Sequence, residues 1–367
     1  MKKRVVHVIY DLDTAGAQTV VMNLLRSFQD DEDYELSVVV GNTYQGLPYE
    51  KEANDRGFEV IYANYNPCIK YRLVRPLINW FRYQYKMFKA IKSLKPDIIH
   101  THLTGILPYV CIPATMICKR RVHTFHSDPY AMNFNLYFWA LLSTHVFRFK
   151  PVGVTESQAE KVRQRYLLSS IDVVHNGLYL KKYKVAESKD AIREELGIAK
   201  DAFLVGSVGR HDPIKNYSFL LKLFYEYSKR NSRAQLALIG QGTETQKLHQ
   251  LVKSLGINDK VNFFGLRNDV ERLYKAMDLF MLTSFFESSS IVTVEAQLSE
   301  IRCVVSDAIP DSVIISNKVN RLSLDTPTEI WLDAIDGKLP ADRKTNSIDD
   351  FSMQKTVREI KSIYSKV

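Results

Sequence analysis

Two glutamates near the end of the chain, Glu287 and Glu295, stand eight positions apart, and Ser288, Ser289 and Ser290 follow the first directly. Eight residues of helix span about 12 Å, so both carboxylates cannot contact one small group. They could instead hold two parts of one elongated ligand. Carboxylates accept hydrogen bonds from sugar hydroxyls, and serine hydroxyls with helix N-terminal amides suit a phosphate. The stretch is compatible with a nucleotide-sugar; the alternative is that Glu287 caps a helix and Glu295 lies on the surface.

Residues 209–216 contain two cations, Arg210 and Lys215, in a loop that follows an apolar run. Arginine offers a planar fork of donors and lysine a compact ammonium, a combination that suits a diphosphate. Solvated surface charge is the alternative for either residue alone. A Gly-Arg pair immediately after a predicted strand favours a site.

A second candidate phosphate loop lies at residues 11–18, between the first predicted strand and the first predicted helix. Gly16 near the helix N-terminus can bring backbone N–H groups close to a phosphate, although it could simply permit a tight turn. Asp11 and Asp13 also resemble a metal-binding pair. Helix capping or turn formation by Asp13 is the favoured interpretation.

Histidines collect in the first half of the chain, at His100, His102, His123 and His126. The alternate pair His100 and His102 would point both rings the same way from a strand, which allows a metal site. No carboxylate or cysteine stands at ligand spacing, so a hydrogen-bonded pair at the domain edge is favoured. His126 ends a strand in a polar turn, where its imidazole either reaches a substrate hydroxyl or is an ordinary core or turn histidine.

The elements that must position these residues alternate along the chain. Short β-rich runs are separated by stretches of helical period, such as residues 15–28, which predicts a parallel α/β sheet. The pattern restarts after residue 202. The predicted strands cover residues 4–10, 36–40, 59–62, 97–100, 121–125 and 151–154 in the first series and 203–208, 235–239, 261–264, 279–282 and 303–306 in the second.

We therefore expect two doubly wound domains, residues 1–176 and 177–349, with a polar hinge over 176–202. The last residues, 350–367, carry an apolar helical face and are expected to pack back on the first domain. Ligands bind such sheets at the carboxyl ends of the strands, so the predicted site lies where the strand-to-helix loops of both domains meet. A length of 367 residues with 46% hydrophobic and 25% charged residues is sufficient for two cores.

Several function classes are disfavoured. Gly240-Gln241-Gly242 lacks the third glycine of a dinucleotide fingerprint, so neither a nicotinamide nor a flavin cofactor is expected. The four cysteines have no CxxC spacing, which indicates buried thiols. The longest uncharged stretch, 103–118, has 16 residues, fewer than a membrane-spanning helix needs. No charged-then-apolar leader precedes the first strand, so an intracellular protein is expected.

With these residues the sequence resembles the family 4 glycosyltransferases, retaining enzymes of the GT-B fold. The resemblance rests on the Gly16-Ala17-Gln18 loop, on "HTFHSDP", "HNGLYLKKY", "GRHDPIKN" and "LIGQGTE", and on the Glu287 and Glu295 pair. These motifs stand in the expected order over nearly the whole chain. Among family members, the sequence is most similar to bacterial enzymes that build exopolysaccharide or capsule.

The resemblance implies a role for each candidate residue. Gly16 and Ala17 would close over the diphosphate, and Arg210 and Lys215 would neutralise it as it leaves. Glu287 would bind the transferred sugar, with Ser288, Ser289 and Ser290 at the phosphate turn. Glu295 would bind the ribose and the backbone of Leu266 and Arg267 the base, while His126 would lie near the reacting carbon. Retention is usually ascribed to same-face attack, with the departing phosphate accepting the proton of the acceptor, and no metal or other cofactor is expected.

One departure from the family pattern concerns the phosphate turn. Relatives often have Glu-Gly-(Phe/Leu)-Pro where this chain has Glu287-Ser288-Ser289-Ser290. Serine keeps hydroxyls and amides available, so activity is expected, with an altered donor choice or rate. The Gly-Gly pair often found after Cys303 is missing as well.

Residues 67–96 form a basic, aromatic segment with eight cations and no acid. Such a segment suits a helix at an anionic membrane, whereas a solvated helix face is the alternative. No nucleic-acid motif accompanies the charge, so nucleic acid is not an expected partner. We expect peripheral attachment to the inner face of the cell membrane, where a lipid-linked glycan would be the acceptor.

The sequence thus predicts a hexosyltransferase that moves a sugar from a nucleotide-sugar, expected to be a UDP-sugar, to a lipid-linked or oligosaccharide acceptor in bacterial surface polysaccharide synthesis. Two alternatives remain. One is a GT-B relative that epimerises or hydrolyses a nucleotide-sugar. The other, suggested by the serine run, is a degenerate transferase that binds nucleotide and regulates a partner.

Overall fold

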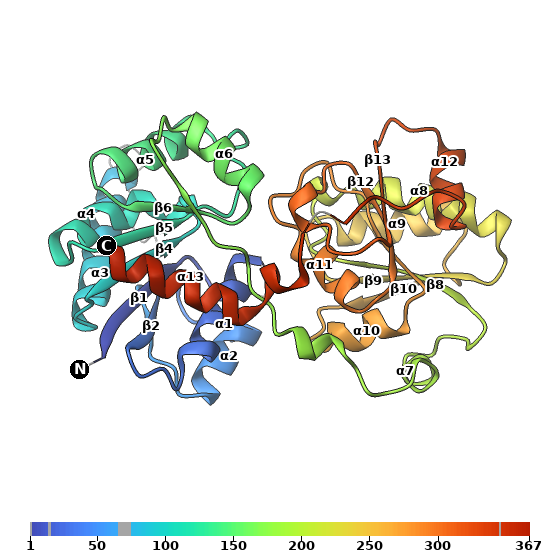
Figure 1. The fold of residues 1–367 in the computed structure, drawn as a ribbon, viewed down its shortest axis with the longest axis horizontal. Helices are drawn as coiled ribbons and strands as arrows, with labels where there is room; N and C mark the ends of the chain where they lie inside the picture. Colours follow the sequence, from blue (N-terminus) through green and yellow to red (C-terminus); the bar gives the residue numbers. More distant parts are fainter. Residues whose placement is uncertain (1, 14–15, 65–74, 345) are drawn as a thin grey trace. The chain divides into compact units, whose positions relative to one another are not determined.

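The computed structural model describes residues 2–13, 16–64, 75–344 and 346–367, and Figure 1 shows the fold. The chain forms two compact units. Unit 1 comprises Met1–Leu178 together with Asp350–Val367, and unit 2 comprises Tyr179–Asp349. The first boundary lies two residues after the one expected from the sequence, and the second coincides with it.

Unit 1 is built on a seven-stranded sheet of order β3-β2-β1-β4-β5-β6-β7. Every adjacent pair is parallel, as the alternation of strands and helices predicted. The strands are β1 (Lys3–Ile9), β2 (Tyr34–Val40), β3 (Val60–Tyr62), β4 (Ile98–His102), β5 (Arg121–Thr124), β6 (Lys150–Gly153) and β7 (Asp172–Val173).

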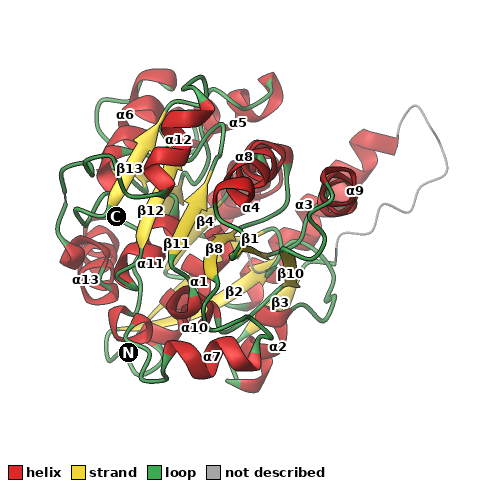
Figure 2. Ribbon diagram, turned by 90° about the vertical axis from the view of Figure 1, so that its right-hand side faces the viewer, coloured by secondary structure: helices red, strands yellow, loops and turns green. Residues whose placement is uncertain are grey.

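Helices pack against both faces of the unit 1 sheet; Figure 2 draws helices red and strands yellow. Helix α1 turns the face that contains Val21, Leu24 and Leu25 into the core. The helices are α1 (Gly16–Phe28), α2 (Pro48–Asp55), α3 (Arg75–Ser93), the 3-10 turn η1 (Thr104–Ile106), α4 (Leu107–Ile117), α5 (Phe134–His145), α6 (Glu156–Arg165) and α13 (Met353–Lys366).

Unit 2 repeats the design with a six-stranded parallel sheet of order β10-β9-β8-β11-β12-β13. Its strands are β8 (Phe203–Val208), β9 (Ala234–Ile239), β10 (Val261–Gly265), β11 (Leu279–Leu282), β12 (Arg302–Ser306) and β13 (Val319–Leu322). Its helices are α7 (Lys189–Glu195), α8 (Tyr217–Arg230), α9 (Thr245–Leu255), α10 (Val270–Ala276), α11 (Ile291–Leu298) and α12 (Thr328–Ile335), with 3-10 turns η2 (Leu180–Tyr183), η3 (Pro213–Lys215) and η4 (Asp311–Val313); a further turn, η5 (Ile348–Phe351), lies where the chain leaves unit 2.

Both predicted series of strands are present, each strand within two residues of its predicted ends. The sequence missed β7 and β13. The first has only two residues, and the second, Val-Asn-Arg-Leu, has two polar residues at its centre. The expected fold, two doubly wound parallel α/β domains, is confirmed.

The expectation that residues 176–202 form a polar hinge is partly wrong, because residues 189–195 form α7 inside unit 2. The guanidinium of Arg193 is buried and donates to Asp278 Oδ2 at 2.6 Å and to the carbonyl oxygen of Ala276 at 2.9 Å. Lys189 reaches the other oxygen of Asp278. A composition rich in charged residues therefore concealed a helix that is held by an ion pair between a buried arginine and a half-buried aspartate.

The last helix, α13, packs on unit 1 beside α1, as Figure 1 shows. Leu178 exchanges two backbone hydrogen bonds with Phe351 and Met353 just ahead of it, at 2.8 and 3.0 Å. The buried face of α13 consists of Met353, Thr356, Ile360, Ile363 and Tyr364. Val357 of the same helix is only half-buried.

Three cysteines, Cys111, Cys118 and Cys303, are buried free thiols, as expected. Cys68 lies outside the described residues. No helix among the residues that the structure describes combines the length and the apolar character needed to cross a bilayer.

Candidate active site

Each unit has one point where the strand order reverses, and ligands of doubly wound sheets bind beside that point at the carboxyl ends of the strands. In unit 1 it lies between β1 and β4, and in unit 2 between β8 and β11. The predicted site residues follow these strands or their neighbours.

In unit 2 the structure brings Lys215 and Glu287 together. The ammonium of Lys215 donates to Glu287 Oε1 at 2.6 Å, and the hydroxyl of Ser284 donates to the same oxygen at 2.7 Å. The Glu287 side chain is only 8% exposed and that of Lys215 is 20% exposed. A cation and a carboxylate thus lie side by side, 72 residues apart in sequence.

The backbone holds the two loops that carry this pair. The amide of Phe285 donates to the carbonyl oxygen of Ile214 at 2.8 Å, and the hydroxyl of Thr283 donates to that of Asn216 at 3.1 Å. Because both loops are tied to each other, the Lys215 and Glu287 pair is positioned by the fold.

The glycines of the next loop also position this region. Gly240 has a φ of +127°, and a Cβ there would lie 2.1 Å from the carbonyl oxygen of Gly209. Glycine at position 240 is therefore required for the two loops to approach closely.

Arg210 lies on the same loop as Lys215 but does not join the pair. Its side chain is 59% exposed and its Nε donates to Asp212 Oδ2 at 2.6 Å. The guanidinium keeps further N–H donors, so it can turn toward an anion by exchanging partners.

Glu295 lies in the second turn of α11, and two tyrosine hydroxyls donate to its carboxylate. Tyr183 reaches Oε1 at 2.7 Å and Tyr274 reaches Oε2 at 3.0 Å. Burial raises the pKa of Glu295, and the two hydrogen bonds act in the opposite direction. Each oxygen has a second lone pair, so the carboxylate can still accept hydroxyl groups of a ligand. The alternative of a purely surface Glu295 is wrong.

The serines form the predicted turn between β11 and α11. Ser290 is buried in a left-handed conformation with a φ of 30°, and its hydroxyl pairs with that of Thr293 at 2.8 Å. Ser288 and Ser289 are half-buried ahead of the helix. No side-chain hydrogen bond from Glu287 caps α11 in the described structure, where the N-cap residue is Ser290.

Leu266 and Arg267 follow β10, as predicted. Leu266 is exposed, whereas Arg267 forms a bidentate pair with Asp269 at 2.7 and 2.8 Å. The side chain of Arg267 is thereby held, and the backbone of this loop is what a base could contact.

In unit 1, His126 follows β5 in a loop whose backbone is fixed. The side-chain amide of Gln158, on α6, donates to the carbonyl oxygens of Phe125 and Ser127 at 3.2 and 3.3 Å. The imidazole of His126 is half-buried, and its Nε2 lies 3.1 Å from Nδ1 of His102. Desolvation lowers the pKa of His126 to about 4, so the ring is neutral at physiological pH.

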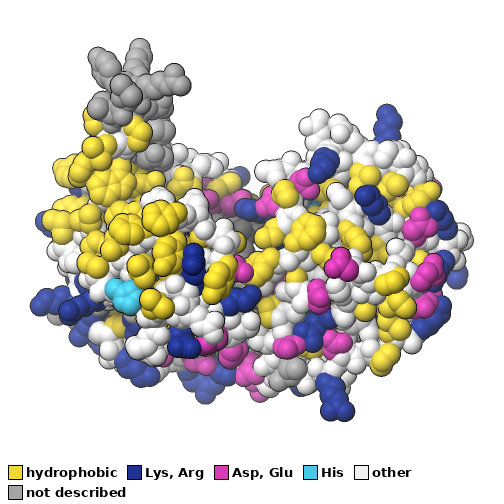
Figure 3. Space-filling model, turned by 90° about the horizontal axis from the view of Figure 1, so that it is seen from above, with side chains coloured by type: hydrophobic (Ala, Val, Ile, Leu, Met, Phe, Trp, Pro, Cys, Tyr) yellow, Lys and Arg dark blue, Asp and Glu magenta, His cyan; other side chains and the backbone are white. Residues whose placement is uncertain are grey.

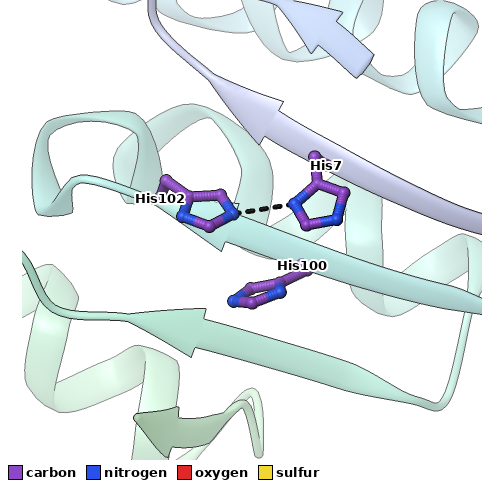
Figure 4. A group of neighbouring side chains, drawn as sticks. All are labelled: His7, His100 and His102. Carbon is purple, nitrogen blue, oxygen red and sulfur yellow. Dashed lines mark hydrogen bonds between the residues drawn. The ribbon is translucent and has the colours of Figure 1, made fainter. Parts of the chain in front are cut away.

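The structure places His100 and His102 at the centre of the sheet, so the expectation of a pair at the domain edge is wrong. Strand β4 lies between β1 and β5. His7, which the sequence analysis missed, stands opposite His100 in the register. Figure 4 shows the three imidazoles together, and their ligand atoms lie within 4.8 Å of one another, close enough to hold a metal ion.

All six ring nitrogens of this group already have hydrogen-bond partners. Nδ1 of His7 lies 2.8 Å from Nε2 of His102, and the other nitrogens contact Tyr364, Thr124 and His126. A metal would have to displace these bonds. An imidazole in the otherwise apolar run Val-Val-His-Val-Ile was the signal that could have revealed His7.

The carboxylate of Asp11 helps to hold the loop before α1. Gln18 donates to Asp11 Oδ1 at 2.6 Å. Gly16 is exposed at the first position of the helix and a Cβ there would meet nothing within 4 Å, while Ala17 is buried. Gly16 is therefore not required for packing. Thr14 and Ala15 lie outside the described residues.

Two doubly wound domains in one chain, with a cation and a carboxylate at the switch point of the second, define the architecture of a GT-B glycosyltransferase. The chain belongs to the glycosyltransferases that combine two family domains. The model "Glycosyltransferase Family 4" matches residues 14–182, and the model "Glycosyl transferases group 1" matches residues 188–339. The expected resemblance and the enzyme class, a hexosyltransferase, are confirmed.

Relatives of known sequence support the assignment. The chain is 28% identical to "Putative glycosyltransferase EpsF" of Bacillus subtilis, over 91% of this chain and 87% of the relative. It is 24% identical to the "UDP-Gal:alpha-D-GlcNAc-diphosphoundecaprenol alpha-1,3-galactosyltransferase" of Escherichia coli, over 76% of this chain and 77% of the relative.

Solved structures share the fold. The crystal structure of Anabaena Alr3699/HepE in complex with UDP-glucose superposes with a TM-score of 0.80 at 18% identity, over 99% of this chain and all of the other. WaaG, described as a glycosyltransferase of lipopolysaccharide biosynthesis, superposes with a TM-score of 0.71 at 15% identity, over 98% of this chain and 94% of the other.

Proposed function

We propose that this enzyme is a retaining glycosyltransferase that moves a sugar from a UDP-sugar to a lipid-linked or oligosaccharide acceptor in bacterial surface polysaccharide synthesis. The observation that carries the proposal is the Lys215 and Glu287 pair at the switch point of unit 2. An ammonium neutralises the departing diphosphate, and the adjacent carboxylate accepts hydroxyl groups of the transferred sugar.

Four further residues of unit 2 fit the rest of the donor. Arg210 adds a second cation for the diphosphate, and Glu295 accepts the ribose hydroxyls. The loop of Leu266 and Arg267 contacts the base through its backbone. A diphosphate stabilised by two cations needs no metal ion, and we propose that the reaction uses none.

In unit 1, Gly16 and Ala17 approach the diphosphate from the start of α1, and His126 contacts the sugar near the reacting carbon. The acceptor hydroxyl attacks that carbon on the face that the diphosphate leaves, and the phosphate oxygen takes the proton of the hydroxyl. The protein positions the reactants and stabilises charge.

The donor and acceptor classes draw support from the similar proteins. Anabaena Alr3699/HepE was solved with UDP-glucose, and the Escherichia coli relative uses UDP-Gal and a diphosphoundecaprenol-linked sugar. WaaG is described as involved in lipopolysaccharide biosynthesis, which suits a role in surface polysaccharide assembly. A uridine nucleotide and a lipid-linked acceptor are therefore the first candidates to test.

A donor screen tests this function. The purified chain is incubated with UDP-glucose, UDP-galactose, UDP-N-acetylglucosamine and GDP-mannose, with and without an undecaprenyl-diphosphate-linked sugar, and nucleotide release and glycolipid products are measured. We expect acceptor-dependent release of UDP and an α-linked product. Release of free sugar without an acceptor would favour the hydrolase, epimerised donor would favour the epimerase, and nucleotide binding without turnover would favour a regulatory protein.

We also propose that unit 1 attaches to the inner face of an anionic membrane through α3, within the segment 67–96. Lys70, Tyr71 and Arg72 of that segment lie outside the described residues. The exposed face of α3 combines large apolar side chains with cations: Leu77, Ile78, Phe81, Arg82, Tyr85, Lys89 and Lys92. Such a face inserts its apolar groups while each cation contributes about 1 kcal/mol beside acidic lipid.

Helix α5 extends this surface. Phe134 is 80% exposed and Phe138 is 45% exposed, and Trp139 of the same helix lies 6.2 Å from Trp80 of α3 between ring centroids. Figure 3 shows apolar side chains gathered over unit 1. Lysine and aromatic side chains also pair, since Lys89 lies 5.0 Å from the Tyr85 ring centre.

Liposome sedimentation tests the membrane proposal. The double variant Lys89→Glu/Lys92→Glu should lose binding to vesicles that contain phosphatidylglycerol, and the control Lys222→Glu/Lys253→Glu, on exposed positions of unit 2, should bind as the parent does. Equal binding of both variants, or no binding by the parent chain, contradicts the proposal.

A further inference from the structure

A continuous line of hydrogen-bonding groups runs through the centre of unit 1 to His126. It starts at the hydroxyl of Thr124, 2.7 Å from Nε2 of His100, whose Nδ1 lies 2.8 Å from the hydroxyl of Tyr364. That hydroxyl is 3.3 Å from Nε2 of His7. We call these groups, with the two that follow, the histidine chain.

The remaining links lead to the candidate active site. Nδ1 of His7 lies 2.8 Å from Nε2 of His102, the contact drawn in Figure 4, and Nδ1 of His102 lies 3.1 Å from Nε2 of His126. The members come from β1, β4, the end of β5 and the C-terminal helix α13. Only the tertiary fold joins them.

The histidine chain is buried as far as His102, and its imidazoles are uncharged. His7, His100 and Tyr364 are fully buried and His102 is 1% exposed. Burial lowers the pKa of His7 to about 3 and lowers the pKa values of His100 and His102 well below the usual range. Each imidazole is therefore neutral, with one N–H donor and one lone pair.

A line of neutral imidazoles is directional. If one ring donates from Nδ1 it must accept at Nε2, so the direction chosen at one link fixes the tautomer of every ring along the line. The Tyr364 hydroxyl has a single proton, so it donates to His100 or His7 and accepts from the other. The tautomer of His126 is consequently coupled to Tyr364, which lies three residues from the end of the chain.

We propose that His7, His102 and Tyr364 are positioning residues for His126: through the histidine chain they orient its imidazole and hold it in one tautomer toward the sugar donor. This inference rests on the proposed role of His126. It assigns a part in the reaction to the last helix of the polypeptide, which contacts His126 only through other side chains in the histidine chain.

The same three imidazoles of His7, His100 and His102 could instead be read as metal ligands. The contacts favour hydrogen bonding, because every ring nitrogen of the group has a partner within 3.3 Å. Two of these partners are the hydroxyls of Tyr364 and Thr124. The group also has no carboxylate among the ligand atoms found together in the described part of the chain.

The test compares three variants in the intact chain. His102→Leu interrupts the histidine chain, and His102→Asn places a polar atom near the former Nδ1. Tyr364→Phe removes a single hydroxyl from a buried ring. The rate of UDP release from the best donor of the screen should fall about tenfold or more in His102→Leu and be partly restored in His102→Asn. Tyr364→Phe should lower it less, because its effect passes through two further rings.

A matched control separates positioning from general damage to the core. His123 is also fully buried in the same sheet; its Nδ1 lies 2.8 Å from the Thr101 hydroxyl, and its Nε2 has no partner in the described structure. It is not a member of the histidine chain. His123→Leu should leave the rate of UDP release close to that of the parent, while its melting temperature falls as much as that of His102→Leu.

The decisive readout is the protonation of His126 itself. Long-range ¹H–¹⁵N spectra of histidine-labelled protein distinguish the two tautomers, and we expect one tautomer in the parent and a mixture in His102→Leu and Tyr364→Phe. An unchanged His126 pattern in both variants overturns the inference. Stoichiometric zinc in the purified chain, with ring signals of His7 and His102 that shift on chelation, overturns it as well.

The variant His126→Ala keeps this inference distinct from the proposed function. If His126→Ala retains full transfer, the proposed role of His126 fails. If His126→Ala is inactive and His102→Leu transfers sugar at the parent rate, only the inference about the histidine chain is contradicted. If both lose activity, His126→Ala/His102→Leu should be no slower than His126→Ala, because His102 acts through His126.

Discussion

Glu287 and Lys215 are coupled, since each is the other's charged partner at 2.6 Å. The proposed role of Glu287 is to bind the transferred sugar, which predicts a particular kinetic pattern. Glu287→Gln should lower kcat about 100-fold while the Kd for free UDP changes less than about threefold, because UDP lacks the group that Glu287 contacts. Initial rates with the preferred donor and calorimetric titration with UDP measure the two quantities.

A second ion-paired carboxylate of unit 2 provides the control. Asp333 pairs with Lys338 at 2.9 Å on α12, away from the loops described above. Asp333→Asn should retain the parent kcat. A large loss of UDP affinity in Glu287→Gln would assign Glu287 to the nucleotide instead of the sugar.

Substitution of Glu295 is predicted to weaken the binding of UDP. A hydrogen bond to a charged group contributes about 1.5–3 kcal/mol, so Glu295→Gln should weaken UDP binding about 10- to 100-fold. Tyr183→Phe, which removes one hydroxyl that orients the carboxylate at 2.7 Å, should have a smaller effect. Calorimetry with UDP measures both. Glu300→Gln, at an exposed position just after α11, is the control, and equal affinities of all three variants would refute a ribose contact.

At the scale of elements, the turn before α11 explains how the serine run replaces the expected motif. Relatives often have proline where this chain has Ser290, yet Ser290 has a φ of 30°, far from the value near −65° that proline requires. The turn of this chain therefore has its own backbone shape. We therefore expect the turn to contact the donor phosphate differently.

The turn can be tested by two substitutions at one position. Ser290→Pro should lower the free energy of unfolding by about 3 kcal/mol. In Ser290→Gly, relief of the left-handed backbone, about 1 kcal/mol, offsets loss of the hydrogen bond to Thr293, also about 1 kcal/mol, so little change is expected. Urea unfolding measures both. Equal stability of the two variants would mean that the turn readjusts.

At the scale of the whole molecule, the buried histidines make unit 1 sensitive to acid. The pKa values of His7 and His123 are lowered to about 3 and that of His126 to about 4, and His100 and His102 are lowered as well. In the unfolded chain these rings titrate near 6.5, so below that pH the unfolded state binds more protons and stability falls.

As the pH is lowered, we expect unit 1 to lose stability at a higher pH than unit 2. Each such histidine contributes a loss of up to about 1.4 kcal/mol per pH unit between pH 6.5 and its folded pKa. In unit 2 the described structure has one histidine with a lowered pKa, His211 at about 4. Hydrogen exchange at pH 7 and pH 5, corrected for intrinsic rates, should show protection lost in peptides of unit 1. Equal losses in both units would contradict this account.

Much of the fold could be predicted because it is encoded locally. Apolar runs of the length of a strand, separated by helical periods, predict a parallel sheet, and the restart after residue 202 predicts a second one. The same reasoning failed where the local signal was weak. A polar composition concealed α7, and β7 and β13 are too short or too polar to be recognised.

The sequence by itself determined the two domains, the strand-to-helix loops that carry Lys215 and Glu287, the helix that carries Glu295, and the class of ligand those residue types suit. Only the tertiary structure decided which of them meet. Lys215 pairs with Glu287 because β8 lies beside β11, and His7 reaches His102 because β1 lies beside β4. Contacts of this kind depend on sheet order and on packing between distant segments, and the residues next to each partner in sequence do not encode them.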